Sequence, residues 1–257
     1  MLREIARKVP WLRDAYVLCL LFTREFAWSH FTNIFWYWSN YSEIKKTGNE
    51  NFSAIKMLPC LSDKTRMTPM DPVYFFQDTW AARKIFELKP VHHHDVGSSA
   101  KTMGILSQYV PVTMVDIRPL PVNLPDLNFI EGSILNLPFQ DGSIESLSSL
   151  CVVEHIGLGR YGDPLDAFGS EKAIKEIQRV VKAGGTIIIS LPVDTKNTVY
   201  FNAHRAFTRE YILKLFDGFE VLEERFQYGY RLVESYAPES GFGTGLFLFR
   251  KPQVAEQ

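Results

Sequence analysis

Four short groups of residues between positions 95 and 205 have the side chains needed to bind a nucleoside or to move a proton. The first is Asp95-Val96-Gly97-Ser98, which combines a carboxylate, a glycine and a hydroxyl in one turn, and the second is Asp116, 21 residues after Asp95. A glycine allows a ligand to approach the backbone closely, and an acid at this spacing can accept both hydroxyls of a ribose. The pattern predicts a nucleoside site, although a solvated turn residue beside Arg118 is an equally simple interpretation of Asp116.

The third and fourth groups offer a binding surface for a base and candidate proton acceptors. Glu131-Gly132-Ser133-Ile134 has an apolar side chain that could pack on a base and a hydroxyl that could hydrogen-bond its edge. Glu154 and His155, together with the distant His204, could act as general bases toward a weak nucleophile. The alternatives are that His155 only shapes its loop through a backbone hydrogen bond and that His204 only begins a helix.

The elements that must position these groups form an alternating pattern, in which β-rich runs and helical runs follow one another from Val91 onward. The predicted strands are Val91–Val96, Val112–Asp116, Asn128–Glu131, Ile144–Cys151 and Thr186–Leu191, and the predicted helices are Ala100–Tyr109, Ser170–Lys182 and Thr208–Phe216. Such alternation is typical of a parallel sheet with helical crossovers, and ligands bind beyond the carboxyl ends of its strands. Since the polar groups follow the strands, they are expected to meet at one edge of the sheet.

The two ends of this region have different patterns. Before it, Asp71-Pro72 begins a predicted helix that runs to about Leu88, with Asp as N-cap and Pro at the first helical position. Later in the chain, Gly184-Gly185 is expected to end the preceding helix. Phe219–Phe226 and Gly245–Arg250 are then predicted strands with no helix between them, which suggests an antiparallel strand inserted at the sheet's edge.

The order of motifs over about 91–250 resembles the class I S-adenosylmethionine-dependent methyltransferases. The motifs are Asp95-Val96-Gly97, Asp116, Glu131-Gly132, Leu137-Pro138-Phe139, Asp141, Glu154-His155-Ile156, and Lys182-Ala183-Gly184-Gly185-Thr186 before a strand that ends Ser190-Leu191-Pro192. More narrowly, Asp95–Ser99, Val153–Pro164 and Phe201–Thr208 are similar to a methyltransferase-like family catalogued as a domain of unknown function. The resemblance implies an α/β fold with a Rossmann-like seven-stranded sheet, mostly parallel, whose last strand is antiparallel.

The same resemblance implies S-adenosyl-L-methionine as cofactor and assigns residues to its parts. The implied contacts are Asp95, Gly97 and Ser98 for the methionine end, Cys151 for the floor beneath the sulfonium, Asp116 for the ribose, and Ser133 and Ile134 for the adenine. Ile117 is a further implied cofactor contact. Ser99 stands where the family usually has the second glycine of its first motif. Ser133 stands where the family usually has an adenine-contacting Asp.

The function implied by the resemblance is methyl transfer to a small-molecule or carbohydrate (glycan) acceptor, with His155, Glu154 and His204 as candidate catalytic residues. The alternative is a non-catalytic protein with a methyltransferase fold that serves as a binding or scaffold module, in contact with a membrane through its N-terminus. A nicotinamide dehydrogenase is disfavoured, because only Gly97 of the three glycines of G-x-G-x-x-G is present.

Composition disfavours several other classes. The 28 Lys and Arg residues balance 29 Asp and Glu residues, so the chain lacks the positive charge typical of nucleic-acid-binding proteins. Cys19, Cys60 and Cys151 form no C-x-x-C pair, which fits neither a disulfide framework nor a zinc cluster and favours a reducing, cytoplasmic compartment. His92-His93-His94 would lie in a strand, where side chains alternate between faces. Three such residues cannot all bind one ion, so no metal site is expected.

The N-terminal segment is set apart by its aromatic content. Eleven aromatic residues, including four of the five Trp, lie between Trp11 and Tyr41. In its first half the longest uncharged run, Ala15 to Thr23, is far shorter than the ~20 residues that a bilayer requires. Two interpretations stay open: helices packed on the main domain, or an interfacial segment over 11–41 that contacts a membrane or a partner. The expected organisation is a helical extension over 1–45, a linker and lead-in helix over 46–90, a methyltransferase-like domain over 91–251 and a tail over 252–257.

Overall fold

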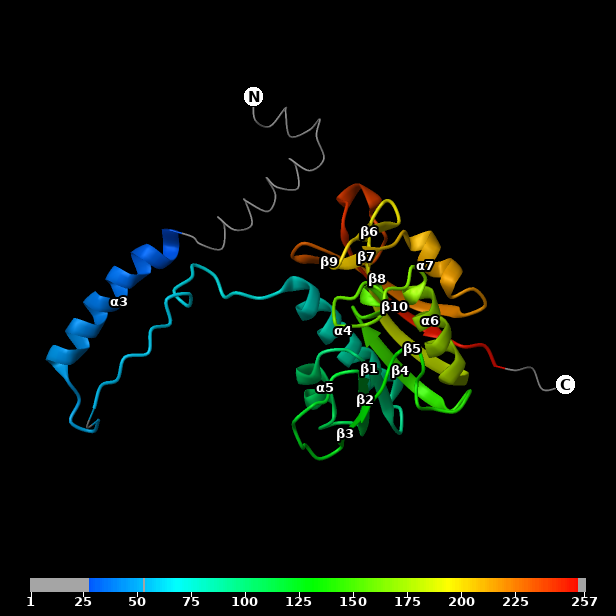
Figure 1. Ribbon diagram of the computed structural model, residues 1–257, viewed down its shortest axis with the longest axis horizontal. Helices are drawn as coiled ribbons and strands as arrows, with labels where there is room; N and C mark the ends of the chain where they lie inside the picture. The colour runs from blue at the N-terminus through cyan, green and yellow to red at the C-terminus, as the bar shows by residue number, and fades with distance from the viewer. Residues whose placement is uncertain (1–27, 53, 254–257) are drawn as a thin grey trace, which may run out of the picture. The chain divides into compact units, whose positions relative to one another are not determined.

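The computed structural model describes residues 28–52 and 54–253 (Figure 1). It divides into two compact units, which meet in the sequence between Pro69 and Met70. The lead-in helix that follows Met70 therefore belongs to the same unit as the sheet, whereas the sequence pattern groups it with the linker.

The first unit contains one helix in its described part, α3 (Trp28–Thr47), followed by an irregular segment. Asn33 donates a side-chain hydrogen bond of 2.8 Å to the Leu61 carbonyl, and the Lys64 ammonium lies 4.5 Å from the centroid of the Trp36 ring. The segment therefore folds back along α3. Residues 11–27 of the aromatic segment lie outside the described residues. No helix within residues 28–52 and 54–253 has the length and hydropathy needed to cross a membrane.

The second unit is built on an eight-stranded sheet with the order β3-β2-β1-β4-β5-β10-β8-β9 (Figure 1). Its strands are β1 (His93–Val96), β2 (Val112–Asp116), β3 (Leu127–Glu131), β4 (Ile144–Leu150), β5 (Val181–Val193), β8 (Glu220–Tyr228), β9 (Arg231–Val233) and β10 (Gly243–Arg250). The pairs β2–β3, β1–β2, β1–β4 and β4–β5 are parallel, and β10 is antiparallel to both β5 and β8. The predicted Rossmann-like sheet with an antiparallel last strand is confirmed, with β9 as an additional edge strand.

Two details of the sheet differ from the sequence prediction. Strand β10 lies inside the sheet between β5 and β8, and not at its edge. Gly184 and Gly185 do not end the helix α6 (Gly169–Val180), because β5 begins directly after it at Val181. Gly184 has a φ of 74° in the irregular start of β5, where the register of β5 against β4 shifts.

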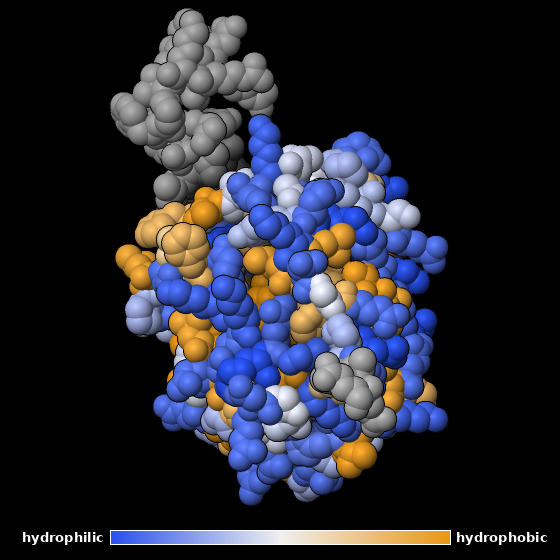
Figure 2. Space-filling view, turned by 90° about the vertical axis from the view of Figure 1, so that its right-hand side faces the viewer, coloured by the Kyte–Doolittle hydropathy of each residue, from blue (hydrophilic) through white to orange (hydrophobic). Residues whose placement is uncertain are grey.

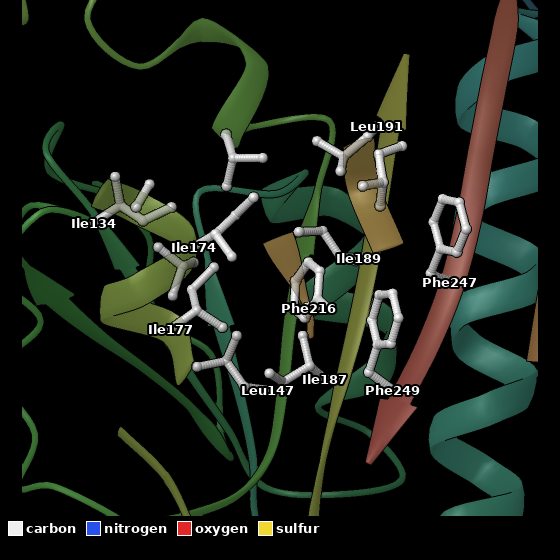
Figure 3. Packing of buried hydrophobic residues seen from close by; sticks show 14 of the residues in the cluster. Ile134, Leu147, Ile174, Ile177, Ile187, Ile189, Leu191, Phe216, Phe247 and Phe249 are labelled. Atoms are coloured by element: carbon white, nitrogen blue, oxygen red, sulfur yellow. The ribbon is translucent and has the colours of Figure 1, made fainter. Parts of the chain in front are cut away.

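Helices cover both faces of the sheet (Figure 1). One face carries α4 (Pro72–Leu88) and α5 (Ala100–Leu106), and the other carries α6 and α7 (Arg209–Leu215). On the α6 and α7 face, Phe216 stacks on Phe249 of β10 with ring centroids 4.1 Å apart, beside Ile187 of β5 (Figure 3). This packing holds the antiparallel strand against the parallel half of the sheet.

Helix α4 begins at Pro72, as predicted, and ends at Leu88, where the prediction placed its approximate end. The Asp71 carboxylate accepts hydrogen bonds from the Val73 and Tyr74 amides at 2.8 and 3.3 Å, and Pro72 begins the helix. On its inner side, Trp80 Nε1 donates to the Glu223 carboxylate of β8 at 3.1 Å. The helix is thereby fixed both at its start and in its middle.

The outer surface on the side of α6 and α7 is predominantly hydrophilic (Figure 2). Hydrophobic residues on this side occur in separate groups between hydrophilic ones (Figure 2). In α6 the residues Ala173, Ile174 and Ile177 are buried against the sheet, whereas Lys172, Lys175 and Gln178 are not. The helix is therefore amphipathic, as its sequence pattern predicts.

A small hairpin between β5 and α7 is absent from the sequence prediction. It pairs β6 (Thr198–Tyr200) with β7 (His204–Ala206) in an antiparallel manner, and Asn202 at its turn has a φ of 61°. The hairpin is joined to the main sheet through a parallel bridge between Val193 and Phe207. It places His204 in a strand and not at the start of a helix.

Candidate functional site

The turn that follows β1 lies at the carboxyl edge of the sheet. Gly97 has a φ of 72°, and a Cβ atom at this position would come within 2.8 Å of the Val152 side chain. Both the backbone conformation and the close packing therefore require glycine. Ser99, the N-cap of α5, has an ordinary φ of −63°, so a second glycine is not needed there.

The Asp95 carboxylate supports this turn from behind. Its Oδ2 accepts the Ser98 amide at 3.0 Å, and its Oδ1 accepts the Ser98 hydroxyl at 2.6 Å and the Ser148 hydroxyl at 2.5 Å. The side chain is fully buried and lines neither of the two cavities described below, and burial raises the pKa of Asp95 to about 6. Asp95 therefore shapes the turn, and Gly97 and Ser98 line the cavity.

Two adjoining cavities open at the carboxyl edge, with volumes of about 520 and 360 Å³. They share the lining residues Gly97, Asp116, Arg118, Cys151 and Tyr161. The larger cavity is also lined by the start of α5 and by Tyr74 of α4, and the smaller one extends between the segments that follow β3 and β4. The turn after β1, the end of β2 and the segments after β3 and β4 therefore meet at this edge.

Asp116 ends β2 and lies on the wall of both cavities. Its Oδ1 accepts hydrogen bonds from the Arg118 amide at 2.8 Å and from Arg118 Nε at 3.2 Å, and its Oδ2 accepts from Nη2 at 3.2 Å. The guanidinium in turn lies 4.8 Å from the centroid of the Tyr161 ring. Each of the two interpretations of Asp116 is therefore consistent with one observation. Asp116 lines the cavity, and it pairs with Arg118.

The smaller cavity has the composition expected of a nucleoside pocket. Ile117, Ser133 and Ile134 line it, and the Ser133 hydroxyl accepts the Leu135 amide at 3.2 Å. The structure thus brings these three predicted residues together with Asp116. An apolar wall next to a carboxylate suits a flat base joined to a diol.

Cys151 occupies the end of β4, between the two cavities, with a φ of 52°. The Ser190 hydroxyl lies 3.4 Å from Cys151 Sγ and 2.8 Å from Gln77 Oε1, and its single proton can be donated to only one of the two at a time. Burial raises the pKa of the Cys151 thiol, and the neighbouring Glu154 carboxyl adds to the effect. The cavity floor is therefore a neutral thiol.

Glu154 is 1% exposed, within the 3-10 turn η1 (Val153–His155). Its Oε2 has no hydrogen-bond partner within the described part of the chain, and burial raises the pKa of Glu154 to about 8. The carboxyl is thus largely protonated at neutral pH. It lies behind His155, with Oε1 3.6 Å from His155 Nε2, and lines neither cavity.

His155 lines the smaller cavity and is joined to the β6–β7 hairpin. Its Nδ1 lies 2.6 Å from the Ala203 carbonyl oxygen, and because a carbonyl only accepts, the proton is on Nδ1. Burial lowers the pKa of His155 to about 4, and the Arg160 charge acts in the same direction. The imidazole is therefore neutral at pH 7 with its lone pair on Nε2, on the side of Glu154. The backbone hydrogen bond that the sequence offers as an alternative is also present.

His204 lies apart from both cavities. Its ring centroid is 5.0 Å from that of Tyr200 and 5.5 Å from that of Phe242, and its pKa is lowered by burial and by Arg160. The structure therefore places His204 in an aromatic cluster at the rim, and it does not bring His204 into contact with Glu154. Within residues 28–52 and 54–253 no group of three metal-binding side chains is found.

Among the lining residues that were not predicted as parts of the site are Tyr74, Arg118 and Tyr161. Tyr74 lies on α4, which precedes the alternating pattern, and its approach to the sheet depends on tertiary packing. Arg118 and Tyr161 are 43 positions apart in the sequence and meet over Asp116. Their only sequence signal is their position shortly after the ends of β2 and β4.

The residues present fit S-adenosylmethionine as a ligand. The smaller cavity offers an apolar wall and the Asp116 carboxylate to an adenosine, and the larger one continues past Gly97 and Ser98 toward the start of α5. Cys151 lies where the two cavities join. The fit therefore rests on the chemistry of the two linings and on their continuity.

Comparison with known proteins gives the fold its context. Residues 139–232 match a family model described as a Caenorhabditis protein of unknown function, DUF268. No curated protein matches the chain in sequence. A candidate sarcosine dimethylglycine methyltransferase from Galdieria sulphuraria is similar in structure, with a TM-score of 0.54, 15% identity and coverage of 72% of this chain and 90% of that one.

Two further solved structures are similar. The N-methyltransferase NodS from Bradyrhizobium japonicum WM9, in complex with S-adenosyl-L-homocysteine, has a TM-score of 0.52 at 13% identity, covering 71% of this chain and 89% of that one. The [4+2]-cyclase SpnF has a TM-score of 0.50 at 15% identity, covering 68% and 82%. These likenesses, together with the strand order, show that the chain has the fold of the class I S-adenosylmethionine-dependent methyltransferases.

Proposed function

We propose that this protein is an S-adenosylmethionine-dependent methyltransferase that acts on a small-molecule or glycan acceptor. The observation that carries the proposal is the pair of adjoining cavities at the carboxyl edge. Ser133 and Ile134 line the smaller one, Ser98 lines the larger one, and Gly97 and Asp116 line both. One of the similar structures is named as a candidate sarcosine dimethylglycine methyltransferase, which supports a small-molecule acceptor.

In this proposal the chain binds and orients, and it handles one proton. When bound, S-adenosylmethionine supplies a methyl group already activated on a sulfonium sulfur. Asp116 would accept the ribose hydroxyls in place of the Arg118 side chain, and Gly97 and Ser98 would hold the methionine end. Positioning an acceptor in line with the methyl group accounts for much of the rate increase. Where the acceptor is a hydroxyl, His155, which lines the smaller cavity, would serve as the base once its Nε2 lone pair turns from Glu154 toward the acceptor. His204, which lies apart from both cavities, would contact the acceptor only where the acceptor extends beyond them to the rim.

Isothermal titration calorimetry with S-adenosylhomocysteine tests the proposal. We expect saturable binding to the full chain, and about tenfold weaker binding or more for Asp116→Ala, since a lost buried hydrogen-bonding partner costs ~1–3 kcal/mol. Asp141→Ala is the matched control, because Asp141 pairs with Arg179 outside both cavities. Absence of binding at millimolar ligand would reject the proposal. Unchanged affinity of Asp116→Ala would reject the ribose assignment alone.

The second candidate is a non-catalytic binding module with the same fold. It is favoured by the Arg118 side chain, which occupies the Asp116 carboxylate through hydrogen bonds to both of its oxygens. The similarity to a [4+2]-cyclase also shows that this fold is compatible with another activity. A screen with isotopically labelled S-adenosylmethionine over fractionated cell extract separates the two, because only an enzyme would label an acceptor fraction.

We also propose that the protein is cytoplasmic and that residues 11–41 make peripheral contact with a membrane surface. In the described part of this segment Phe35 is 71% exposed and Trp38 is 49% exposed, and Lys45 and Lys46 follow in the last turn of α3. Exposed aromatic rings beside lysines are typical of segments that lie in the membrane interface.

A further inference from the structure

We propose that His93 is a positioning residue for the turn that holds the cofactor's methionine end, acting through Ser148 on the Asp95 carboxylate. This inference rests on the proposed function of the same cavity. It gives a role to His93, the middle residue of the His92-His93-His94 run. His93 belongs neither to the proposed cofactor contacts nor to the candidate bases. His93 and Ser148 lie on the neighbouring strands β1 and β4.

Two hydrogen bonds connect His93 to the turn's carboxylate, and a third holds its other ring nitrogen. His93 Nδ1 lies 2.9 Å from the Ser146 hydroxyl, His93 Nε2 lies 2.9 Å from the Ser148 hydroxyl, and the Ser148 hydroxyl lies 2.5 Å from Asp95 Oδ1. His93, Ser148 and Asp95 are fully buried, and Ser146 is 1% exposed. This series of hydrogen bonds is therefore shielded from water along its whole length.

The direction of every proton in this series of hydrogen bonds follows from elementary rules. An ionised carboxylate only accepts, so the Ser148 hydroxyl proton points to Asp95. The Ser148 oxygen must then accept from His93 Nε2–H. A neutral imidazole has a single N–H, so Nδ1 accepts from the Ser146 hydroxyl. His93 is neutral because burial lowers its pKa to about 3. The result is one donor-to-acceptor chain that ends on Asp95.

The series of hydrogen bonds continues into the turn itself. Asp95 holds the Ser98 amide and hydroxyl, and the Ser98 oxygen accepts the Leu150 amide of β4 at 2.9 Å. Ser98 lines the larger cavity. The orientation of a cavity-lining residue is thus connected by consecutive hydrogen bonds to a histidine in the middle of the sheet.

Sheet stability alone does not explain this arrangement. Strands buried on both faces of a parallel sheet are usually apolar, and buried polar groups cost free energy that their hydrogen bonds only offset. Replacing both partners of such a bond by apolar groups of similar shape can be nearly neutral. The polar chain is explained by the carboxylate that it orients.

The test measures S-adenosylhomocysteine affinity and the amide hydrogen exchange of Ser98 in four full-length variants. Ser148→Ala and His93→Leu should bind ~10-fold more weakly and exchange Ser98 faster, because a hydrogen bond to a charged group is lost or loosened. His93→Gln can still donate to Ser148 and should recover most of the affinity. Ser149→Ala is the matched control, since Ser149 is equally buried on β4 but donates to the Val96 carbonyl.

A pH profile separates positioning from core filling. Burial raises the pKa of Asp95 to about 6, and the nearby charge of Asp78 on α4 acts in the same direction, whereas the bonds from Ser148 and Ser98 lower it. Affinity should therefore fall as the pH drops through about 6, where Asp95 gains a proton and the turn loses an acceptor. In Ser148→Ala this fall should begin at higher pH, because one stabilising bond to the carboxylate is missing.

The outcomes distinguish this inference from the proposed function. Wild-type affinity, Ser98 exchange and pH profile in both Ser148→Ala and His93→Leu would overturn the positioning role while the proposed function stands. Loss of affinity in Ser149→Ala equal to that in Ser148→Ala would also overturn it. A wild-type chain that binds no S-adenosylhomocysteine would overturn the proposed function and this inference together, whatever the exchange at Ser98.

Discussion

At the scale of single residues, two backbone conformations shape the site. Gly97 and Cys151 line both cavities, and both have positive φ angles, 72° and 52°. This conformation is ordinary for glycine, but for a residue such as cysteine it costs of order 1–3 kcal/mol unless its surroundings enforce it. The turn after β1 and the end of β4 are therefore the two points where the backbone departs from regular strand geometry to form the cavity.

Gly97→Ala should destabilise the protein more than Gly218→Ala. Gly218 has a φ of 82°, and a methyl group added there would have no atom within 4 Å, so its substitution isolates the conformational cost of ~1–2 kcal/mol. At Gly97 the added methyl group also meets the Val152 side chain at 2.8 Å, which should add ~1–3 kcal/mol. Urea denaturation measures both losses. Equal losses would contradict the packing argument.

At this scale the sequence predicted which residues gather, but not how each side chain faces. Asp116, Ser133 and Ile134 line a cavity because they follow parallel strands whose carboxyl ends meet at one edge. Asp95 follows the same rule in sequence, yet its carboxylate is held by Ser148 of the neighbouring strand. That contact depends on the pairing of β1 with β4, which the pattern of one chain does not specify.

At the scale of elements, α4 links the site to β8, a strand near the other edge of the sheet. Tyr74 near its start lines the larger cavity, and Lys84 near its end pairs with Glu223 of β8 at 2.6 Å. Asp71 caps the start of α4, because its carboxylate accepts hydrogen bonds from two backbone amides in the first turn of the helix. The position of the cavity wall therefore depends on how well the helix start is formed.

Asp71→Ala should lower the free energy of unfolding by about 1 kcal/mol, because the first turn of α4 loses its cap. Asp71→Asn keeps an oxygen that can accept the same amides and should stay close to wild type. Chemical denaturation followed by circular dichroism measures both variants. A loss as large in Asp71→Asn as in Asp71→Ala would show that the charge, and not the cap, matters.

The predictability of elements follows their length and pattern. The start of helix α4 could be predicted to the residue, since Asp71 and Pro72 mark it by local chemistry. The β6 and β7 strands have three residues each, too few for a periodic pattern. The interior position of β10 is a matter of long-range pairing. Local sequence shows that β8 and β10 are strands, but not that β10 pairs on both sides.

At the scale of the whole molecule, the two units differ in how they use hydrophobic residues. The sheet unit buries them in two clusters, one on each face. In the first unit, exposed hydrophobic residues occur both on α3 and on the segment that follows it, among them Phe35, Phe52 and Leu58. Such exposure in the described part of that unit is the basis for the proposed membrane contact.

The full chain should sediment with vesicles that contain phosphatidylserine. The double variant that carries both Phe35→Ser and Trp38→Ser should sediment several-fold less. Loss of exposed aromatic rings removes interfacial contact area, while Asn40→Ala, on the same helix, removes none and serves as control. Binding should weaken with added salt, because Lys45 and Lys46 would contact the anionic lipid. Equal sedimentation of the two variants would contradict the proposal.

The interior position of β10 has a consequence for the order in which the molecule can assemble. Residues 243–250 supply Phe247 and Phe249 to the core and join β5 to β8, so the sheet cannot close until this segment has left the ribosome. Until then β5 and β8 present unpaired edges, which are prone to pair with other chains. We therefore expect the nascent protein to depend on chaperones until residues 243–250 have emerged. A nonsense codon just before Gly243 should yield aggregate and not a shortened domain.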